Sequence, residues 1–600
     1  MKKILLSITF ALMGIVSGFA AKAHTALTTI TQSDGSQLTI RLHGDEHFSW
    51  YSTADDVLLV QVGNNYYVAQ VEEDGTLKAT PQLAHNAGER GTVEEQVINN
   101  QNKEKFLNSL NAEPQALAKP IGTVTPAYFP HTGSPKALVI LVEFQDVKFK
   151  TSDPVATFTH YLKGADGEEA PEANNAYVTK GMVNYGSVSQ YFKDMSQGQF
   201  KPQFDIVGPV TVSKNSAYYG GNTGRTDANF AKMIAEACKG VSDKVNFADY
   251  DLNNDGFVDL VYVIYAGYSE SINGNSSDCL WPKSGTNAFY EPGTNNLLKL
   301  NGKRICRYGI NNELNGTPKN WIEGKPLLNG IGLFCHEFSH TMGLPDLYPT
   351  VETSRVDNQN PEYWDLMDGG EYTYSGYFPT PYSPWEMEVM GWTTPVELGD
   401  EAKQVNLNSY ASDRTTYKIN GKNDEYLLIQ NIQTDGWWRG ITKAYNTGML
   451  VWRIDYPYTT VSLDNRLNNE IGKPNVMIVP ADGYVISAYN VTDDDESKAK
   501  YKASLKADPF PGANNVPELL SVKLNKSTLK KPFYNIKETN GVITFDYLKD
   551  YATGIDQTLA DKDTEKNQSI FSLDGRYLGN DASKLTKGIY IIGKKKVVIK

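Results

Sequence analysis

The sequence predicts an α+β chain built from several domains. Three observations lead to this prediction: short alternating segments before residue 97, strand-length apolar runs alternating with helical spacing between residues 136 and 266, and recurring short strands from residue 403 to about 548. A chain of 600 residues with 40% hydrophobic content is long enough to form several packed cores.

Residues 1–23 have the features of a Sec-type signal peptide. Two lysines precede an apolar run over residues 4–21, and residues 21–23 (Ala-Lys-Ala) form a small-x-small cleavage site. No second apolar run approaches about 18 residues, so we expect no transmembrane anchor. We therefore expect an exported protein, secreted or held at the cell surface. Its 70 acidic and 57 basic residues argue against a nucleic-acid partner.

Residues 24–120 are predicted to form a β-rich unit followed by a polar connector. Segments such as residues 36–42 and 57–62 alternate apolar and polar side chains, and turn residues separate them. Residues 97–119 are rich in Asn, Gln and Lys, and residues 103–110 within them have helical character.

Residues 121–398 are predicted to form a mixed α/β domain. Residues 136–144 and 260–266 are continuous apolar runs of strand length, while residues 187–195 and 227–239 have helical spacing. Four cysteines in this region permit two disulfides in an exported protein, and the sequence does not fix their pairing: Cys238, Cys279, Cys306 and Cys335.

An acidic loop precedes the second of these strands and predicts a Ca²⁺ site. Oxygen ligands occupy alternate positions of a calcium loop, namely Asp251, Asn253, Asp255, the Phe257 carbonyl and Asp259. The twelfth position is Tyr262 and not the Glu of an EF-hand. A solvated acidic turn therefore stays open as the alternative.

The most informative stretch is His336-Glu337-x-x-His340. Residues four apart return to the same face of a helix, so both imidazoles can bind one metal ion. Glu337 can take a proton from the attacking water. With only eight histidines in 600 residues, a chance match on a buried helix is the weaker explanation.

A third ligand is predicted shortly after this helix. No histidine follows His340, so a later ligand must be a carboxylate or water. Gly343 permits a sharp break and Pro345 prevents the helix from continuing. Asp346 can then complete a tetrahedral Zn²⁺ site with one position left for water. The alternative for Asp346 is a turn or capping carboxylate.

These residues resemble a known family. The pattern H-E-x-x-H-x-x-G-x-x-D resembles that of the metzincins with Asp in place of the third His, and residues 336–348 resemble the immune inhibitor A family of secreted bacterial metalloendopeptidases. Residues 187–200 and 384–392 are similar to the same family. The resemblance covers about residues 40–550, and it implies a metzincin-like fold for residues 121–398, bound Zn²⁺, and protein or peptide substrates.

The resemblance also implies roles downstream of the zinc stretch. Residues 364–370 are similar to the family's Met-turn, which places Met367 beneath the metal, although Gly369 stands where several metzincins have Tyr. Because no histidine remains for stabilising an oxyanion, Tyr372 and Tyr374 are the candidates for that role.

Residues 24–120 resemble the prosegments of the same family. Asp45, or its neighbour Glu46, is a candidate latch that covers the open coordination position, as an Asp does in some metzincin zymogens. A carboxylate in an ordinary turn is the alternative.

Two further parts follow the predicted catalytic domain. Residues 399–550 are predicted to form a β-sandwich. Residues 551–600 comprise a polar linker and short strands that resemble the C-terminal sorting domain of the type IX secretion route, which implies the secretion machinery as a partner. The alternative for this tail is a small stabilising hairpin domain.

Together these features predict a secreted zinc endopeptidase with Glu337 as general base. Two alternatives stay open: a catalytically inactive surface adhesin built on a protease scaffold, and a zinc hydrolase that acts on a bond other than the peptide bond.

Overall fold

The structure, a computed structural model, describes residues 17–19, 23, 27–45, 48–112, 129–164, 183–222, 227–272, 274–456, 466–492, 494–550 and, with short gaps, 570–599. The chain divides into two compact units, Met1–Lys549 and Asp550–Lys600. Its mixture of helices and sheets confirms the α+β class. The predicted signal peptide lies largely outside the described residues. Within the described part, no helix is both long and apolar enough to span a bilayer.

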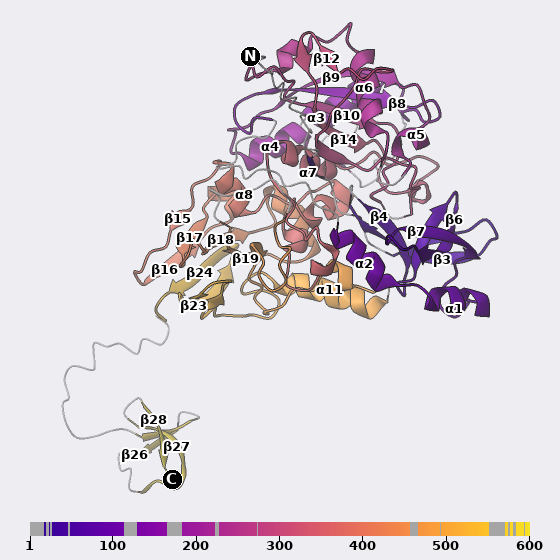
Figure 1. Cartoon of the computed structure of the whole chain (residues 1–600). Helices are drawn as coiled ribbons and strands as arrows, with labels where there is room; N and C mark the ends of the chain where they lie inside the picture. The colour runs from indigo at the N-terminus through magenta and orange to yellow at the C-terminus, as the bar shows by residue number, and fades with distance from the viewer. Residues whose placement is uncertain are drawn as a thin grey trace, which may run out of the picture. The chain divides into compact units, whose positions relative to one another are not determined.

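A six-stranded mixed sheet supports the candidate site (Figure 1). Four neighbouring strands, which include one edge strand, pair in parallel, and the remaining two are joined by antiparallel pairing at the other edge. The strand order is β1 (Ser17–Phe19), β11 (Lys283–Thr286), β14 (Arg307–Asn312), β10 (Val261–Tyr265), β8 (Lys136–Glu143) and β9 (Gln203–Thr211). The strands predicted at residues 136–144 and 260–266 are confirmed as β8 and β10.

Helices cover both faces of this sheet: α3 (Pro154–Lys163), α4 (Val188–Met195), α5 (Ser216–Gly220), α6 (Phe230–Gly240) and α7 (Ile331–Thr341). Val139 and Leu141 of β8 enter the same core as α3, α4 and α7, whereas Leu138 and Ile140 enter the core that contains α6. Successive side chains of a strand point to opposite faces, so a strand buried on both faces reads as a continuous apolar run.

The four cysteines are free thiols. Cys238 lies in the core on the α6 face and Cys335 in the core on the α7 face. The sheet thus lies between these two sulfur atoms.

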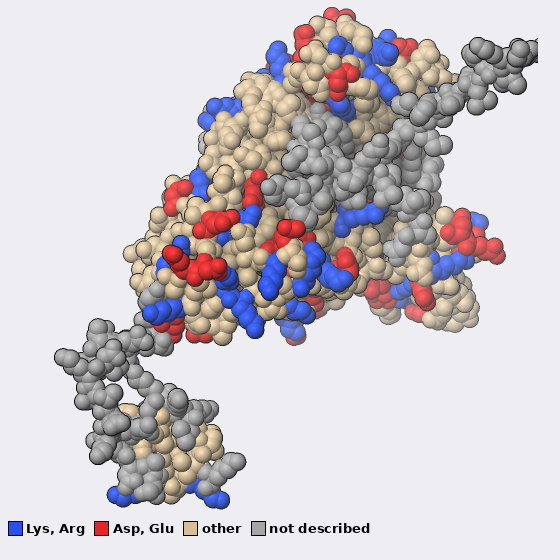
Figure 2. Space-filling view, turned by 60° about the vertical axis from the view of Figure 1, so that its left-hand side comes forward, with Lys and Arg blue, Asp and Glu red and all other residues tan. Residues whose placement is uncertain are grey.

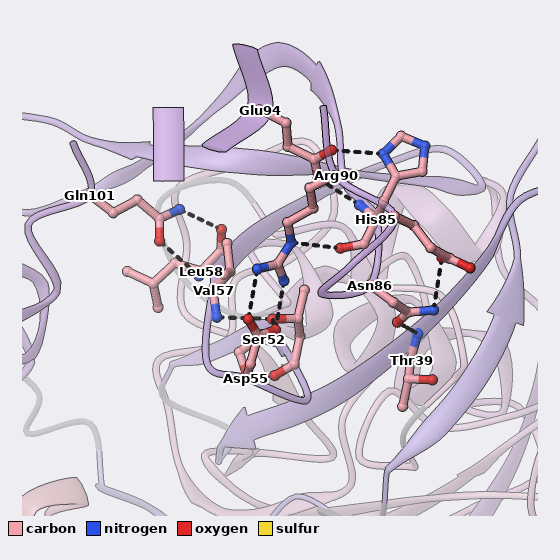
Figure 3. Close-up of polar contacts among 12 residues, drawn as sticks. Thr39, Ser52, Asp55, Val57, Leu58, His85, Asn86, Arg90, Glu94 and Gln101 are labelled. Atoms are coloured by element: carbon pink, nitrogen blue, oxygen red, sulfur yellow. Dashed lines mark hydrogen bonds and ion pairs between the residues drawn. The ribbon is translucent and has the colours of Figure 1, made fainter. Parts of the chain in front are cut away.

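Residues 27–112 form the N-terminal meander, an antiparallel sheet whose strands follow sequence order, with two helices after it. Its elements are β2 (Thr28–Thr31), β3 (Gln37–Gly44), β4 (Ser49–Thr53), β5 (Leu58–Val62), β6 (Asn65–Val71), β7 (Leu77–Leu83), α1 (Thr92–Asn99) and α2 (Lys103–Ala112). Figure 3 shows how polar side chains fasten it: Arg90 donates to both carboxylate oxygens of Asp55, at 2.7 and 2.6 Å, and Gln101 bonds the backbone N–H and C=O of Leu58. The predicted helix at residues 103–110 is confirmed as α2.

Residues 396–547 contain two sheets that share one core. The larger sheet has the order β15 (Val396–Glu397), β17 (Tyr417–Asn420), β18 (Tyr426–Ile432), β19 (Gly448–Ile454) and β20 (Val476–Ile478). The smaller has the order β16 (Lys403–Leu407), β24 (Val542–Tyr547) and β23 (Phe533–Thr539). The opposite face of the larger sheet, including Leu428 and Trp452, joins the core that contains α7.

Shorter elements complete the larger unit: the strand pairs β12 (Lys299–Leu300) with β13 (Lys303–Arg304) and β21 (Val522–Lys523) with β22 (Thr528–Leu529), and the helices α8 (Pro384–Val389), α9 (Tyr410–Asp413), α10 (Arg439–Ala444) and α11 (Asp495–Ala507). The second unit holds one four-stranded sheet of order β26 (Tyr577–Gly579), β25 (Ile570–Ser572), β27 (Gly588–Ile592) and β28 (Lys595–Ile599).

Acidic and basic side chains are interspersed over the described surface on the face that Figure 2 shows. This face therefore has mixed charge, which is the usual arrangement on a soluble surface and not the one-sided basic field of a nucleic-acid binder.

Candidate metal centre

Helix α7 carries the two predicted histidine ligands and ends directly after them. All eleven of its residues are buried. The helix ends at Thr341, and Gly343 has a φ of +104°, a left-handed backbone conformation that favours glycine. The predicted break is therefore confirmed, and the chain turns back so that Asp346 returns to the helix.

His336, His340 and Asp346 form a buried triangle. The Nε2 atoms of the two histidines lie 3.2 Å apart, and Oδ1 of Asp346 lies 3.2 and 3.3 Å from them. Ligand atoms bound at 2.0–2.1 Å to a tetrahedral zinc ion are about 3.3 Å apart. The spacing of the three atoms thus fits a tetrahedral site.

The other nitrogen of each ring fixes the orientation of the triangle. Nδ1 of His336 lies 3.1 Å from the carbonyl oxygen of Leu366, and Nδ1 of His340 lies 2.7 Å from that of Leu344. Since a carbonyl only accepts, each Nδ1 carries a proton, and Nε2 of each ring is the atom that faces the triangle. Two imidazole nitrogens and a carboxylate that face one another form a donor set that suits a divalent cation such as Zn²⁺.

The buried charges of the site act strongly on one another. Burial lowers the pKa of His336, but the carboxylates of Glu371 and then Asp346 raise it to about 10. For His340 burial prevails, and its pKa is lowered. Burial acts to raise the pKa of Asp346, yet the two histidines hold it below its usual range. Asp346 is therefore ionised and available as a ligand.

Glu337, the predicted general base, is fully buried on the same helix. Its charge acts on Tyr372: burial raises the pKa of this tyrosine, Glu371 and Glu337 raise it further, and a hydrogen bond with Ser271 lowers it. The structure thus brings Tyr372 into the electrostatic reach of Glu337.

The second tyrosine candidate lies differently. Tyr374 is 51% exposed, and its ring packs against Phe378 with the centroids 6.0 Å apart. Its backbone has a φ of +49° inside the 3₁₀ segment η6 (Gly369–Gly376). Of the two candidates, Tyr372 is thus the one whose charge interactions involve Glu371 and Glu337.

The predicted Met-turn packs directly against the triangle. Met367 is fully buried in the core of α7, and its carbonyl accepts the N–H of Leu347 at 2.8 Å. The preceding carbonyl, that of Leu366, is the acceptor for His336. The turn thus holds the His336 ring and Leu347, the residue after Asp346.

Asp45 lies at the end of strand β3 and is buried. Its charge acts on Arg355, whose pKa is lowered by burial but raised above its usual range by Glu352 and, more weakly, by Tyr489 and Asp45. The triangle itself comprises only His336, His340 and Asp346 among the described residues. Glu46 lies outside the described residues.

The predicted calcium loop gathers its three carboxylates. Oxygen atoms of Asp251, Asp255 and Asp259 lie within 4.8 Å of one another. The Asn253 side-chain oxygen accepts the N–H of Asp255, and the N–H of Phe257 donates to the Asp255 carboxylate, both at 2.9 Å.

Two basic residues approach the same carboxylates. Lys303 lies 2.6 Å from Asp251, and Arg307 lies 2.8 Å from Asp255 and 3.2 Å from Asp259. Burial raises the pKa of Asp259 to about 6. The neighbouring aspartates also raise this pKa, while Arg307 lowers it. The loop therefore has internal counter-charges that compete with any bound cation.

Sequence reasoning missed two residues of the site, Glu371 and Ser271. Glu371 is fully buried, and its Oε2 lies 3.7 Å from Nδ1 of His336. Ser271 bonds Tyr372 from the loop after β10. The one available signal was a charged residue directly after the Gly369-Gly370 pair, and that signal is not specific.

Known proteins match this part of the chain. Residues 128–392 match the family model described as "Immune inhibitor A peptidase M6, catalytic domain". That range includes helix α7, the triangle and Met367.

Two relatives cover similar stretches. The "Pre-pro-metalloprotease PrtV" of Vibrio cholerae serotype O1 is 24% identical over 281 residues, which cover 42% of this chain and 29% of that protein. "Immune inhibitor A" of Bacillus thuringiensis subsp. alesti is 24% identical over 323 residues, which cover 47% of this chain and 44% of that protein. The chain thus spans less than half the length of either relative. Residues 128–392 are therefore similar to the catalytic domain of the immune inhibitor A peptidases.

Proposed function

We propose that the chain is a zinc-dependent endopeptidase that hydrolyses peptide bonds of extracellular proteins. The observation that carries the proposal is the triangle of His336, His340 and Asp346, with Glu337 buried beside it. The match to a peptidase family and the name of the metalloprotease relative support it. A zinc ion in the triangle would supply a Lewis acid that polarises the substrate carbonyl and eases removal of a proton from water.

The protein's own groups have distinct roles in this proposal. Glu337 accepts a proton from the attacking water and delivers it to the leaving nitrogen. The Tyr372 hydroxyl donates to the carbonyl oxygen as negative charge develops there. The Leu366 carbonyl holds the His336 ring, and Met367 packs in the core that contains α7.

The Glu337→Gln variant tests the proposal. Processed wild-type protein should hydrolyse casein, a chelator should abolish the activity, and the processed variant should be inactive while binding one Zn²⁺ per chain. Elemental analysis and an unfolding curve establish that the variant is loaded and folded. Substantial casein hydrolysis by the loaded variant would refute the role of Glu337.

The same measurements separate the two alternatives. An inactive adhesin would leave casein intact and bind no stoichiometric zinc. A hydrolase of another bond would bind zinc and still leave casein intact. Only the endopeptidase couples casein hydrolysis to the bound metal.

The proposal includes an exported precursor. It assigns residues 1–23 to a signal peptide, 24–120 to a prosegment, 121–398 to the catalytic domain, 399–550 to a β-sandwich and 551–600 to a type IX sorting domain. The separate compact unit at 550–600 and the separate sheet of the N-terminal meander support these divisions. If Asp45 acts as a latch, the Asp45→Ala precursor hydrolyses casein and the wild-type precursor does not.

The acidic loop at residues 251–259 is proposed to bind Ca²⁺. The three gathered carboxylates support this, and Lys303 and Arg307 oppose it. If the loop binds, Ca²⁺ raises the unfolding temperature of the wild type but not of Asp255→Asn. An equal response in both chains would leave a salt-bridged turn as the better description.

A further inference from the structure

Segment η6 lies unusually close to helix α7. A methyl group at Gly332 would overlap the carbonyl oxygen of Glu371, and one at Gly330 would overlap the backbone of Gly376. Only glycine at these two positions of the helix start permits such an approach. The backbone of η6 is therefore fixed against the start of α7.

This contact directs the Glu371 side chain toward a metal ligand. Gly332 and His336 are four residues apart and share one face of α7. With its backbone held at Gly332, Glu371 places Oε2 3.7 Å from Nδ1 of His336, and both side chains are fully buried. At such a distance in a buried site, a carboxylate interacts strongly with an imidazole.

The two histidine ligands differ on this side of the ring. Nδ1 of His340 faces the Leu344 carbonyl at 2.7 Å. Nδ1 of His336 has a longer contact with the Leu366 carbonyl, at 3.1 Å, and the Glu371 carboxylate lies behind it. The weaker carbonyl contact at His336 is thus accompanied by a full negative charge.

We propose that Glu371 is a positioning residue of the metal centre, which holds His336 in the tautomer and orientation that present Nε2 to the metal. The proposal rests on the proposed metal site. A carboxylate behind a ligand imidazole favours the proton on Nδ1 and makes Nε2 a stronger donor. In this proposal Glu371 acts through His336 and has no direct part in the reaction with the substrate or the attacking water.

Replacements at position 371 test the proposal in the Glu337→Gln background, in which the chain does not digest itself. Glu371→Gln keeps the shape of the side chain and removes its charge. Glu371→Asp keeps the charge but shortens the side chain by one methylene group, which moves the carboxylate away from His336. The Zn²⁺ dissociation constant is measured by competition with a chromophoric chelator. The visible spectrum of the Co²⁺-loaded protein reports the ligand geometry.

We expect affinity to fall in the order Glu, Asp, Gln, with Glu371→Gln weakened about 10- to 100-fold and its Co²⁺ spectrum altered. Glu362→Gln is the matched control, because Glu362 is also fully buried but bonds Asn360, the N–H of Ala488 and Tyr501. That control should bind Zn²⁺ as the parent does.

Equal Zn²⁺ affinity and an unchanged Co²⁺ spectrum in Glu371→Gln would overturn the role of Glu371. If Glu371→Gln does not fold, equal affinities of the Glu371 and Glu371→Asp chains would overturn it. A parent chain that binds no stoichiometric zinc would instead defeat the proposed function itself.

Discussion

At the scale of single residues, the site combines full burial with several negative charges. Glu337, Asp346 and Glu371 are each at most 1% exposed. Burying an ionised carboxylate is costly unless an opposite charge compensates it. Because a divalent cation provides that compensation, the residues around the triangle are better explained by a metal than by packing.

Tyr372 and Tyr374 allow a matched test of transition-state stabilisation. Tyr372 lies within reach of the Glu337 charge, whereas Tyr374 is half exposed and packs against Phe378. Tyr372→Phe should lower kcat on the order of 100-fold with little change in KM, because the lost donor acts on charge that develops only in the transition state. Tyr374→Phe should keep both constants. Steady-state kinetics on a peptide substrate checks this, and an unchanged kcat in Tyr372→Phe would contradict it.

The sequence allowed the triangle to be predicted because its geometry is local. Helix periodicity brings His336 and His340 together, and Gly343 and Pro345 turn the chain so that Asp346 follows. Glu371 could not be predicted this way, because only tertiary packing brings η6 to α7. Lys303 and Arg307 were missed at the acidic loop for the same reason.

At the scale of elements, the apolar pattern of the sequence predicted the central strands that are buried on both faces. It did not predict the strands at or next to the edge of the sheet. Strand β8 reads as a continuous apolar run and was found from it. Strand β11, Lys-Ser-Gly-Thr, has no such pattern and lies next to the sheet edge. Strand order also escaped prediction, since it depends on pairings between distant segments.

The contact between α7 and η6 can be tested at Gly332. Gly332→Ala should destabilise the protein by about 1–3 kcal/mol, because the added methyl would overlap the Glu371 carbonyl. Zn²⁺ affinity should fall as well, since η6 carries Glu371. Urea unfolding of the metal-free chain and zinc titration check both effects.

Gly399→Ala is the control for this change. Gly399 is exposed, and a methyl group there meets nothing within 4 Å. Its stability and zinc affinity should match those of the wild type. A Gly332→Ala chain that matched it would show that η6 can move away without consequence.

At the scale of the whole larger unit, the N-terminal meander contacts three regions of the chain. Trp281, next to β11, is part of the meander's own core. Arg41 donates to the carbonyls of Tyr489 and Val491 at 3.1 and 2.9 Å. His43 lies 3.7 Å from Glu352, which pairs with Arg355 soon after Asp346. The meander thus restrains the segment after Asp346 as well as the sheet edge.

The Glu352 contact makes this attachment sensitive to acid. Burial acts to raise the pKa of Glu352, but Arg355 and then His43 lower it from 4.5 to about 2. A carboxyl group with a lowered pKa in the folded state stabilises that state fully above pH 4.5, and the contribution disappears as the pH falls toward 2. This shift of the Glu352 pKa corresponds to about 3 kcal/mol of folding stability.

Glu352→Gln should therefore remove part of the pH dependence of stability. The free energy of unfolding in urea should differ between wild type and Glu352→Gln by far more at pH 5.5 than at pH 3. Glu72→Gln is the control, since Glu72 pairs with Lys78 at 3.8 Å on the surface of the same meander and exposed pairs contribute little. If the two variants lose the same stability at both pH values, the Glu352 contact does not hold the meander in place. Another contact, such as that of Trp281, would then hold it.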